Sequence, residues 1–413
     1  MRTAFTLLTS TLLATAATAS VGTQPPDSAS SAILAVEPEP AWRDAPLEAY
    51  RRELFALAFE VASAIPHEPH IKTRSRMQEQ VVETALALDQ PTSAVAFVRQ
   101  IDNWRRAHGN AMLAYYWADA GNKEMAQEFL KAAQDELNSA EDWRRDRVRV
   151  KIAQTYLLLG QDPQAKLYST NLVESERGKV EGIAARTASE EDFLSQASEL
   201  DMMLAMDDQD INKNALDSYG ELFGRHYDNE ELRAEVVRKV KASSEKLPVF
   251  MRLEMLADLA KQALAHDDRE TALILVDEAQ SFLTDFEWAP RYHVEYWGLV
   301  IGLRAKAGDV DTARTLADET LAYYGEKGPG IVNIYRAQAL RSLAEAYAAI
   351  GDEEKALEVY KLAVEEGFEN PNSRPRAEDL SQTLTSMARV SVEPDAVLWT
   401  RVRQIAEGLG APW

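Results

Sequence analysis

The residues of this chain that could do chemistry are few and widely spaced. The nearest approach to a metal site is His67-Glu68-Pro69-His70, where two histidines lie three positions apart. Pro66 and Pro69 place both histidines in a loop, and the sequence indicates no third ligand of the kind that a zinc site needs. We therefore expect no metal at this cluster.

A second candidate for a metal site consists of acidic residues. Asp208, Asp210 and Asn212 have the spacing that opens a calcium-binding loop, but the sixth position is Lys213, where such a loop needs glycine. These residues belong to a longer run, 190–231, that holds thirteen Asp and Glu against two basic residues. We interpret the run as a solvated acidic face, with a docking strip for a basic partner as the alternative.

Motifs of catalysis and nucleotide binding are absent. The sequence contains no G-x-S-x-G, no G-x-x-x-x-G-K and no H-E-x-x-H. Gly325, Gly328 and Gly330 could present free N–H groups to an anion, but Pro329 among them favours a connector between helices. The absence of cysteine excludes thiolate catalysis, disulfides and cysteine-ligated zinc. We expect a protein that is not an enzyme and has no cofactor.

The charge balance excludes one class of partner. The chain has 45 Lys and Arg against 67 Asp and Glu, a formal net charge of −22. Such a field repels phosphate backbones unless one face is locally basic. Nucleic acid is therefore not an expected partner.

The N-terminal residues predict export. In residues 1–19, Arg2 precedes an uncharged stretch rich in Leu, Thr and Ala that ends in Ala17-Thr18-Ala19, the pattern of a secretory signal with an A-x-A cleavage site. The stretch is too short and too polar for a membrane span, and no cysteine follows for lipidation. Residues 20–45 are rich in Pro and Ser, which predicts a flexible tether. We expect a periplasmic or secreted protein with no integral span after signal cleavage.

From residue 46 to 413 the pattern is helical and repetitive. The Trp-Arg-Arg of residues 104–106 recurs at 143–145, and Gly121 recurs as Gly160, both at a shift of 39 residues. Later copies follow at shifts of 41 and 43. A fixed period of about forty residues predicts stacked units, each a pair of antiparallel helices. A divergent acidic segment, 173–248, interrupts the register.

The residue types of the unit around Gly351 fit a pair of antiparallel helices. Gly351 supplies the left-handed conformation that ends the first helix, and Asp352 can cap the second. Ala344 and Ala356 are placed where the two helices cross, because close packing needs a small side chain at the contact.

At these positions the chain resembles the tetratricopeptide repeat family. The best copy has the family's large, small and aromatic residues at every characteristic offset: Leu340, Leu343, Ala344, Tyr347, Gly351, Ala356, Tyr360 and Ala363. Units around Gly121, Gly160 and Gly308 are similar, one around Asp267 lacks the turn glycine, and weaker echoes occur near Asp89, Asp210 and Ser391. The resemblance covers residues 79–405, and its period of 39–43 residues is longer than the family's 34. It implies an all-α, right-handed solenoid of antiparallel helical hairpins with a concave groove that binds a protein or peptide partner.

In this family the first helix of each unit lines the groove. On that register the inward candidates for partner binding are His108, Tyr115, Asp119, Arg147, Lys151, Gln154, Glu295, Arg341 and Glu345. The alternative is that these residues form a solvated face without a ligand. We expect Trp104, Trp117, Trp143, Trp297 and Trp399 to pack in the core, and the arginines of the two Trp-Arg-Arg segments to pair with the chain's own carboxylates.

Two functions remain open. The first is a non-enzymatic adaptor or scaffold of the bacterial cell envelope, whose groove holds a protein or peptide. The second is a carbohydrate-active hydrolase or lyase in which the hairpins close into a toroid, with Glu295, Tyr292, His293 and Tyr296 lining a central cleft. The solenoid register favours the adaptor, whereas contact between the first and last units, with a carboxylate pair facing a closed cleft, would favour the enzyme.

Overall fold

The computed structural model describes residues 43–137, 142–187, 189–245 and 247–413. The expected signal peptide and nearly all of the expected tether lie outside these residues. These described residues form one compact unit. No described helix is both long enough and apolar enough to cross a membrane.

The described residues are helical and contain no strand. The helices are α1 (Ala49–Ala64), α2 (His67–Ala87), α3 (Pro91–Val98), α4 (Arg105–Asp119), α5 (Lys123–Glu136), α6 (Asp142–Leu158), α7 (Asp162–Ser169), α8 (Glu174–Thr187), α9 (Phe193–Leu204), α10 (Gln209–Arg225), α11 (Glu230–Ser244), α12 (Val249–Ala265), α13 (Arg269–Asp285), α14 (Pro290–Lys306), α15 (Val310–Lys327), α16 (Asn333–Ile350), α17 (Glu353–Phe368), α18 (Ser373–Val390) and α19 (Ala396–Glu407). The glycine-rich segment predicted to be a connector is a short 3-10 turn, Gly328–Gly330, between α15 and α16.

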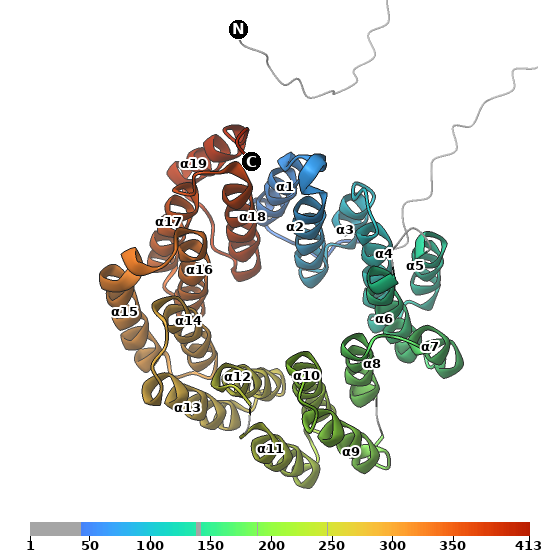
Figure 1. Ribbon diagram of the computed structural model, residues 1–413. Coiled ribbons are helices and arrows are strands. Elements are labelled where there is room, and N and C mark those ends of the chain that lie inside the picture. The colour runs from blue at the N-terminus through green and yellow to red at the C-terminus, as the bar shows by residue number, and fades with distance from the viewer. Residues whose placement is uncertain (1–42, 138–141, 188, 246) are drawn as a thin grey trace, which may run out of the picture. The chain divides into compact units, whose positions relative to one another are not determined.

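The helices of this unit form two layers around a central opening (Figure 1). The even-numbered helices from α2 to α18 line the opening, and each packs against the next even-numbered helix. Most odd-numbered helices from α3 onward lie outside and pack against a neighbouring inner helix, as α5 does on α4 and α17 on α16. The described chain is thus an inner wall of helices with an outer layer behind it.

Left-handed turns end most of the inner helices. The predicted turn glycines, Gly121, Gly160, Gly308 and Gly351, all have positive φ. The same turn occurs without glycine where the repeat pattern is weaker, at Asp89, Asp267 and Ser391, with φ of 53°, 58° and 61°. A side chain in this conformation costs about 1 kcal/mol relative to glycine.

The weaker echo of the repeat near Asp210 does not mark a left-handed turn. Asp210 lies in the first turn of α10, because the carboxylate of Asp208 caps that helix by accepting hydrogen bonds from the backbone N–H groups of Asp210 and Ile211 at 2.9 and 3.0 Å. The helix that carries Ala215 is therefore an inner helix rather than the second helix of a unit.

Small residues allow the helices to approach closely. Ala344 and Ala356 are fully buried where α16 packs on α17, as the repeat pattern predicts. Gly298 lets α14 approach α16: a Cβ atom on Gly298 would lie 2.6 Å from the backbone of Ser342. The inner wall therefore depends on a few small side chains.

Tryptophans and arginines of the repeat are used internally. Trp104, Trp117 and Trp297 are buried and Trp399 is packed against the core, which confirms the expectation for these four; the Trp143 side chain lies outside the described residues. Arginines of the first Trp-Arg-Arg segment pair with the chain's own carboxylates: Arg105 with Glu79, and Arg106 with Glu136 at 3.0 Å.

The first helix closes the ring by packing against α18. Tyr50 Oη donates to the carbonyl of Ser391 at 2.9 Å, and Arg51 Nε donates to the carbonyl of Ala388 at 2.7 Å. The apolar face of α1 is buried in the same core as α18. Helices about 330 residues apart in sequence are thus neighbours, and the concave surface expected of an open solenoid becomes the inner wall of a ring (Figure 1).

Candidate functional site

Three hollows lie on the inner wall, lined by the even-numbered helices and their caps. We name each after one residue. The Lys151 hollow, about 630 Å³, lies among α2, α4, α6 and α8. The Arg389 hollow, about 430 Å³, lies among α2, α16 and α18. The Lys306 hollow, about 760 Å³, lies among α12, α14, α16 and α18.

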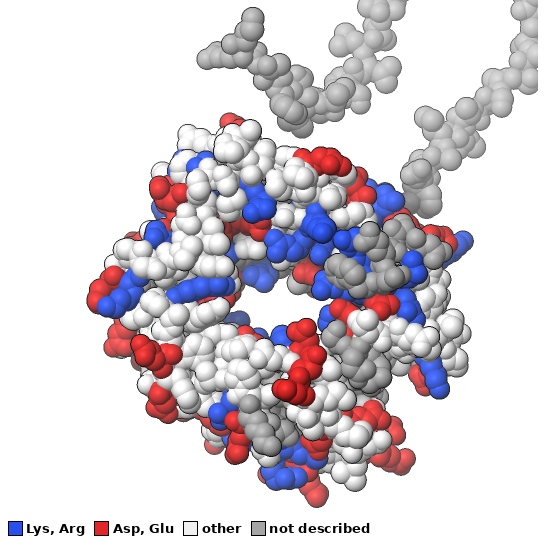
Figure 2. All heavy atoms as spheres, viewed as in Figure 1, with Lys and Arg blue, Asp and Glu red and all other residues white. Residues whose placement is uncertain are grey.

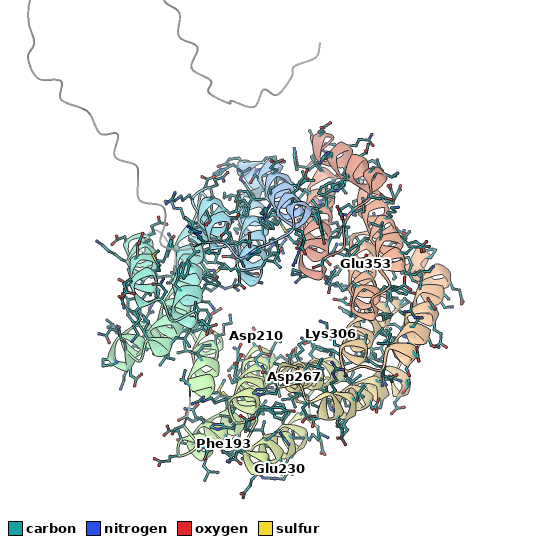
Figure 3. All side chains as sticks on the ribbon, turned by 180° about the vertical axis from the view of Figure 1, so that it is seen from behind. Phe193, Asp210, Glu230, Asp267, Lys306 and Glu353 are labelled. Atoms are coloured by element: carbon teal, nitrogen blue, oxygen red, sulfur yellow. The ribbon has the colours of Figure 1, made fainter. Side chains whose placement is uncertain are left out.

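The three hollows form one band along the wall. Glu83 and Ala87 of α2 line both the Lys151 hollow and the Arg389 hollow. Arg389 of α18 lines both the Arg389 hollow and the Lys306 hollow. Basic side chains gather at the rim of the central opening (Figure 2), and Lys306 lies at its edge when the ring is seen from behind (Figure 3). A ligand could therefore follow the wall from α8 round to α12.

The charge of this band is opposite to that of the chain. Eight basic residues line it: Arg105, Arg147, Lys151, Lys179, Lys261, Lys306, Arg341 and Arg389. Five acidic residues line it: Glu79, Glu83, Asp119, Glu176 and Glu345. Since the whole chain has a net charge of −22, the band is a basic surface on an acidic protein.

The structure places most of the predicted binding residues in this band. Six share the Lys151 hollow: His108, Tyr115, Asp119, Arg147, Lys151 and Gln154. Arg341 lines the Arg389 hollow and Glu345 lines the Lys306 hollow. Glu295 lines none of the three hollows; its carboxylate accepts a hydrogen bond from Gln338 Nε2 at 2.8 Å.

Several charged groups of the Lys151 hollow hold one another in place. The carboxylate of Glu79 on α2 pairs with Arg105 and lies 2.8 Å from Nδ1 of His108, both on α4. Burial, together with the nearby Lys151 and Arg105 cations, lowers the pKa of His108. The imidazole is therefore neutral at pH 7, and the geometry suits donation from Nδ1–H to Glu79.

The opposite wall contains a second paired group. Glu176 of α8 lies 2.9 Å from Lys179 Nζ and 3.4 Å from Arg147 Nε. Gln154 is buried, and its Nε2 donates to the carbonyl of Lys179 at 2.6 Å. Its Oε1 is buried and accepts no hydrogen bond from the described residues. The hollow thus contains an acceptor that lacks a donor.

Lys151 stands between these two groups. Its Nζ lies 4.3 Å from the centre of the Tyr115 ring and makes no ion pair or hydrogen bond within the described part of the chain. Burial lowers the pKa of Lys151 to about 8, although the nearby Glu83 carboxylate opposes this shift. Burial also raises the pKa of Glu83. Lys151 is therefore a half-buried cation held mainly by an aromatic face.

Arg341 and Glu345 are also bonded within the wall. Arg341 is buried between α16 and α18, where it contacts Asp379 at 3.2 Å and Gln382 Oε1 at 2.5 Å. Burial raises the pKa of Asp379, and the Arg341 guanidinium opposes that rise. Glu345 accepts hydrogen bonds from Ser386 Oγ at 2.6 Å and Arg389 at 3.0 Å. Arg341 thus connects two inner helices as well as lining a hollow.

Sequence reasoning missed several residues of the band. Glu79 and Glu83 lie on α2, in a unit whose repeat pattern is too weak to show which residues face inward. Lys179 lies in the divergent segment, and Lys306 is at the end of α14. Extending the same register to the weak units would have found Glu79 and Glu83, because they are four residues apart on one helix face.

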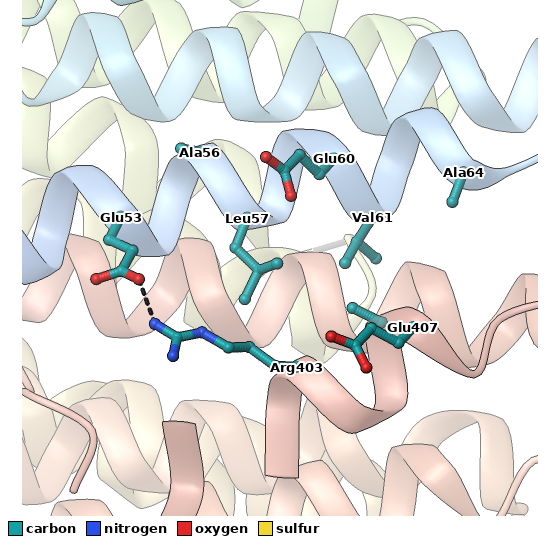
Figure 4. Close-up of a pocket in the computed structure, with 9 residues that line it drawn as sticks. Glu53, Ala56, Leu57, Glu60, Val61, Ala64, Arg403 and Glu407 are labelled. Carbon is teal, nitrogen blue, oxygen red and sulfur yellow. Dashed lines mark hydrogen bonds and ion pairs between the residues drawn. The ribbon is translucent and has the colours of Figure 1, made fainter. Parts of the chain in front are cut away.

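A fourth hollow lies at the closure of the ring, between α1 and α19 (Figure 4). Arg403 pairs with Glu53 across it, and Glu60 and Glu407 extend from opposite walls. Its apolar lining comes from small and aliphatic side chains such as Leu57 and Val61. Nothing in the sequence predicted this hollow.

The remaining candidates of the sequence lie apart from the band. Residues 68–70 have non-helical backbone angles near the start of α2, as the two prolines predict. Within the described residues, no group of three or more His, Asp or Glu is arranged to hold a metal ion. Most carboxylates of the run 190–231 are exposed on and around α9 and α10.

Comparisons with known proteins add no identity. No family model matches the sequence, and no curated protein matches it significantly.

Proposed function

We propose that the chain is a non-enzymatic adaptor or scaffold of the bacterial cell envelope that binds a protein or peptide partner on the inner wall of its ring. On this proposal the helices are tetratricopeptide-like hairpins in a right-handed solenoid, and residues 1–19 direct export. The single observation that carries the binding role is the continuous basic band on the inner wall of an acidic chain. Eight of the nine residues expected to bind a partner line that band.

The closure of the ring limits the form of the partner. Because α1 is packed against α18, a bound segment would reach the wall through the central opening rather than from an open side. An extended segment or a chain end fits this route better than a folded domain. Main-chain flexibility in the partner is therefore part of the proposal.

Affinity capture from envelope extract tests this function. The chain is immobilised, and retention by wild type is compared with that of an inner-wall variant, Lys151→Glu with Lys306→Glu. The matched control carries the same charge change on the exposed faces of outer helices, Lys131→Glu with Lys166→Glu. We expect a stoichiometric partner on wild type and control and none on the inner-wall variant. Equal retention by all three would show that the inner wall is not the binding surface.

A carbohydrate-active hydrolase or lyase is the second candidate, and the contact between α1 and α18 favours it because a toroid needs such closure. The residues expected to line its cleft have other partners. Tyr296 Oη donates to Glu254 at 2.9 Å, His293 stacks on Tyr323 at 4.1 Å, and none of the expected residues lines the inner band. Release of reducing ends from envelope polysaccharide, lost in Glu83→Gln, would favour the enzyme.

A further inference from the structure

The Lys151 hollow has one cation that its own surroundings leave available. Glu79 forms an ion pair with Arg105 and a hydrogen bond with His108. Glu176 forms ion pairs with Lys179 and Arg147. The remaining cation is Lys151, whose Nζ lies 4.3 Å from the centre of the Tyr115 ring and makes no ion pair or hydrogen bond within the described residues.

Glu83 is the carboxylate that acts on the charge of Lys151, but it does not form a stable ion pair with it. Burial favours the protonated form of Glu83, and no hydrogen bond or ion pair joins it to Lys151. A half-buried ammonium without an ion pair gains strongly from an incoming carboxylate, because water no longer competes fully for it.

A hydrogen-bond acceptor without a donor lies on the same helix as Lys151. Gln154 follows Lys151 by three positions on α6, so both face the hollow. The buried Oε1 of Gln154 lacks a donor, so a bound N–H group would satisfy it. A ligand that has both a carboxylate and an N–H group completes both, and an acidic residue within a peptide has both.

The charge of the hollow selects a monoanion. Its lining is balanced, with four carboxylates from Glu79, Glu83, Asp119 and Glu176 and four cations from Arg105, Arg147, Lys151 and Lys179. One bound carboxylate adds a single negative charge, which Lys151 offsets, whereas a doubly charged phosphate ester leaves a negative charge without a cation. Peptide carboxylates carry a single charge. The wall therefore favours aspartate or glutamate side chains over phosphorylated ones.

We propose that the Lys151 hollow is a sub-site for an acidic side chain of the peptide partner. The ligand carboxylate pairs with Lys151 Nζ, and Gln154 Oε1 accepts a hydrogen bond from a ligand backbone N–H. This inference rests on the proposed function, since it names the chemistry of the segment that the inner wall binds.

The pH dependence identifies the lysine. Because the pKa of Lys151 is about 8, raising the pH from 7 to 9 discharges it, whereas ordinary lysines keep their charge to about pH 10. Charged and titratable groups face Lys151 from all four helices of the hollow: Glu79 and Glu83 from α2, Arg105, His108 and Asp119 from α4, Arg147 from α6, and Glu176 and Lys179 from α8.

The experiment uses the full chain and three probes: a fluorescent decapeptide of alternating Gly and Glu, its Gly and Gln counterpart, and tetragalacturonate. Fluorescence anisotropy measures the two peptides, and the sugar is a competitor. We expect the Glu peptide alone to bind, with affinity about tenfold lower in Lys151→Met and unchanged in the outer-helix control Lys131→Met. Affinity for wild type should fall with a midpoint near pH 8.

Three results would overturn the sub-site. Equal affinity of Lys151→Met and wild type for the Glu peptide would remove Lys151 from binding. No binding of the Glu peptide at all would remove the acidic ligand. Displacement of the peptide by tetragalacturonate at lower concentration than the peptide itself would assign the hollow to an acidic glycan. Capture of a partner by the wild-type chain tests the adaptor role without reference to Lys151, so failure of the sub-site can be told apart from failure of the proposed function.

Discussion

Replacing Lys151 by methionine should make this protein more stable at neutral pH. The ammonium group is half-buried on the inner wall and has no ion pair within the described residues. Methionine keeps most of the length and apolar volume of the lysine stem and carries no charge. The substitution therefore removes a desolvated cation with little change in packing.

The size of the effect follows from the pKa of Lys151, which burial lowers to about 8 from about 10.4 in the unfolded chain. At about 1.4 kcal/mol for each unit, charging the folded-state lysine costs about 3 kcal/mol. Part of the side chain reaches solvent, and the variant leaves Glu83 without its compensating cation. We expect Lys151→Met to raise the free energy of unfolding at pH 7 by ~1–2 kcal/mol.

Lys151 makes the stability of the wild-type protein depend on pH. Between pH 8 and about 10.4 the folded lysine is neutral while the unfolded lysine still binds a proton, so the stability of wild type rises relative to the variant. The gap between the two proteins is therefore widest below pH 8 and closes toward pH 10. Urea denaturation followed by circular dichroism at a series of pH values measures it, with Lys131→Met on the exposed face of α5 as the control. A variant less stable than wild type at pH 7, or a gap independent of pH, would refute this account of Lys151.

Three further substitutions test the packing by the same urea assay. Gly298→Ala should lower the free energy of unfolding by ~2 kcal/mol, because its Cβ would lie 2.6 Å from the backbone of α16. Gly302→Ala should cost nothing, because its Cβ would lie 3.8 Å from the Cα atom of Ala346. Arg341→Met should cost ~3 kcal/mol at pH 7, because Asp379 stays buried without its cation. Loss of Arg341 raises the pKa of Asp379 further, so this cost should shrink as the pH falls and Asp379 takes up a proton, and adding Asp379→Asn should restore stability. Asp267→Gly should add up to ~1 kcal/mol by relieving the positive φ of the turn, and no gain there would contradict that reading.

Much of the helical organisation can be predicted from local sequence. The glycines at 121, 160, 308 and 351 and the alanines at the helix crossings act within one hairpin, so a period of about forty residues is enough to place them. The turns at Asp89 and Ser391 have the same left-handed conformation, but aspartate and serine do not predict it. At Asp210 the pattern is misleading, because the aspartate two positions earlier caps a helix instead.

Closure of the ring could not be predicted in this way. It depends on the small rotation between successive units, which accumulates around the wall until α1 meets α18. The contacts that close it join Tyr50 and Arg51 to backbone carbonyls, and carbonyls leave no mark in the sequence.

The candidate site shows the same division. The repeat register predicts that His108 and Lys151 both face inward, because equivalent positions of successive inner helices face the same side. It could not show that Arg341 is bonded to Asp379, or that Glu79 pairs with Arg105, because these partners belong to helices whose positions depend on tertiary packing. The lowered pKa of Lys151 likewise depends on burial by helices distant in sequence.

The central claim is that the partner lies on the inner wall, and site-specific photo-crosslinking tests it most directly. A benzophenone side chain is placed at Lys306, exposed on the inner helix α14, or at Leu167, which is 68% exposed on the outer helix α7. After irradiation in envelope extract, the account predicts a discrete adduct from position 306 and none from position 167. An adduct from position 167 alone would contradict it, because the partner would then bind the outside of the ring.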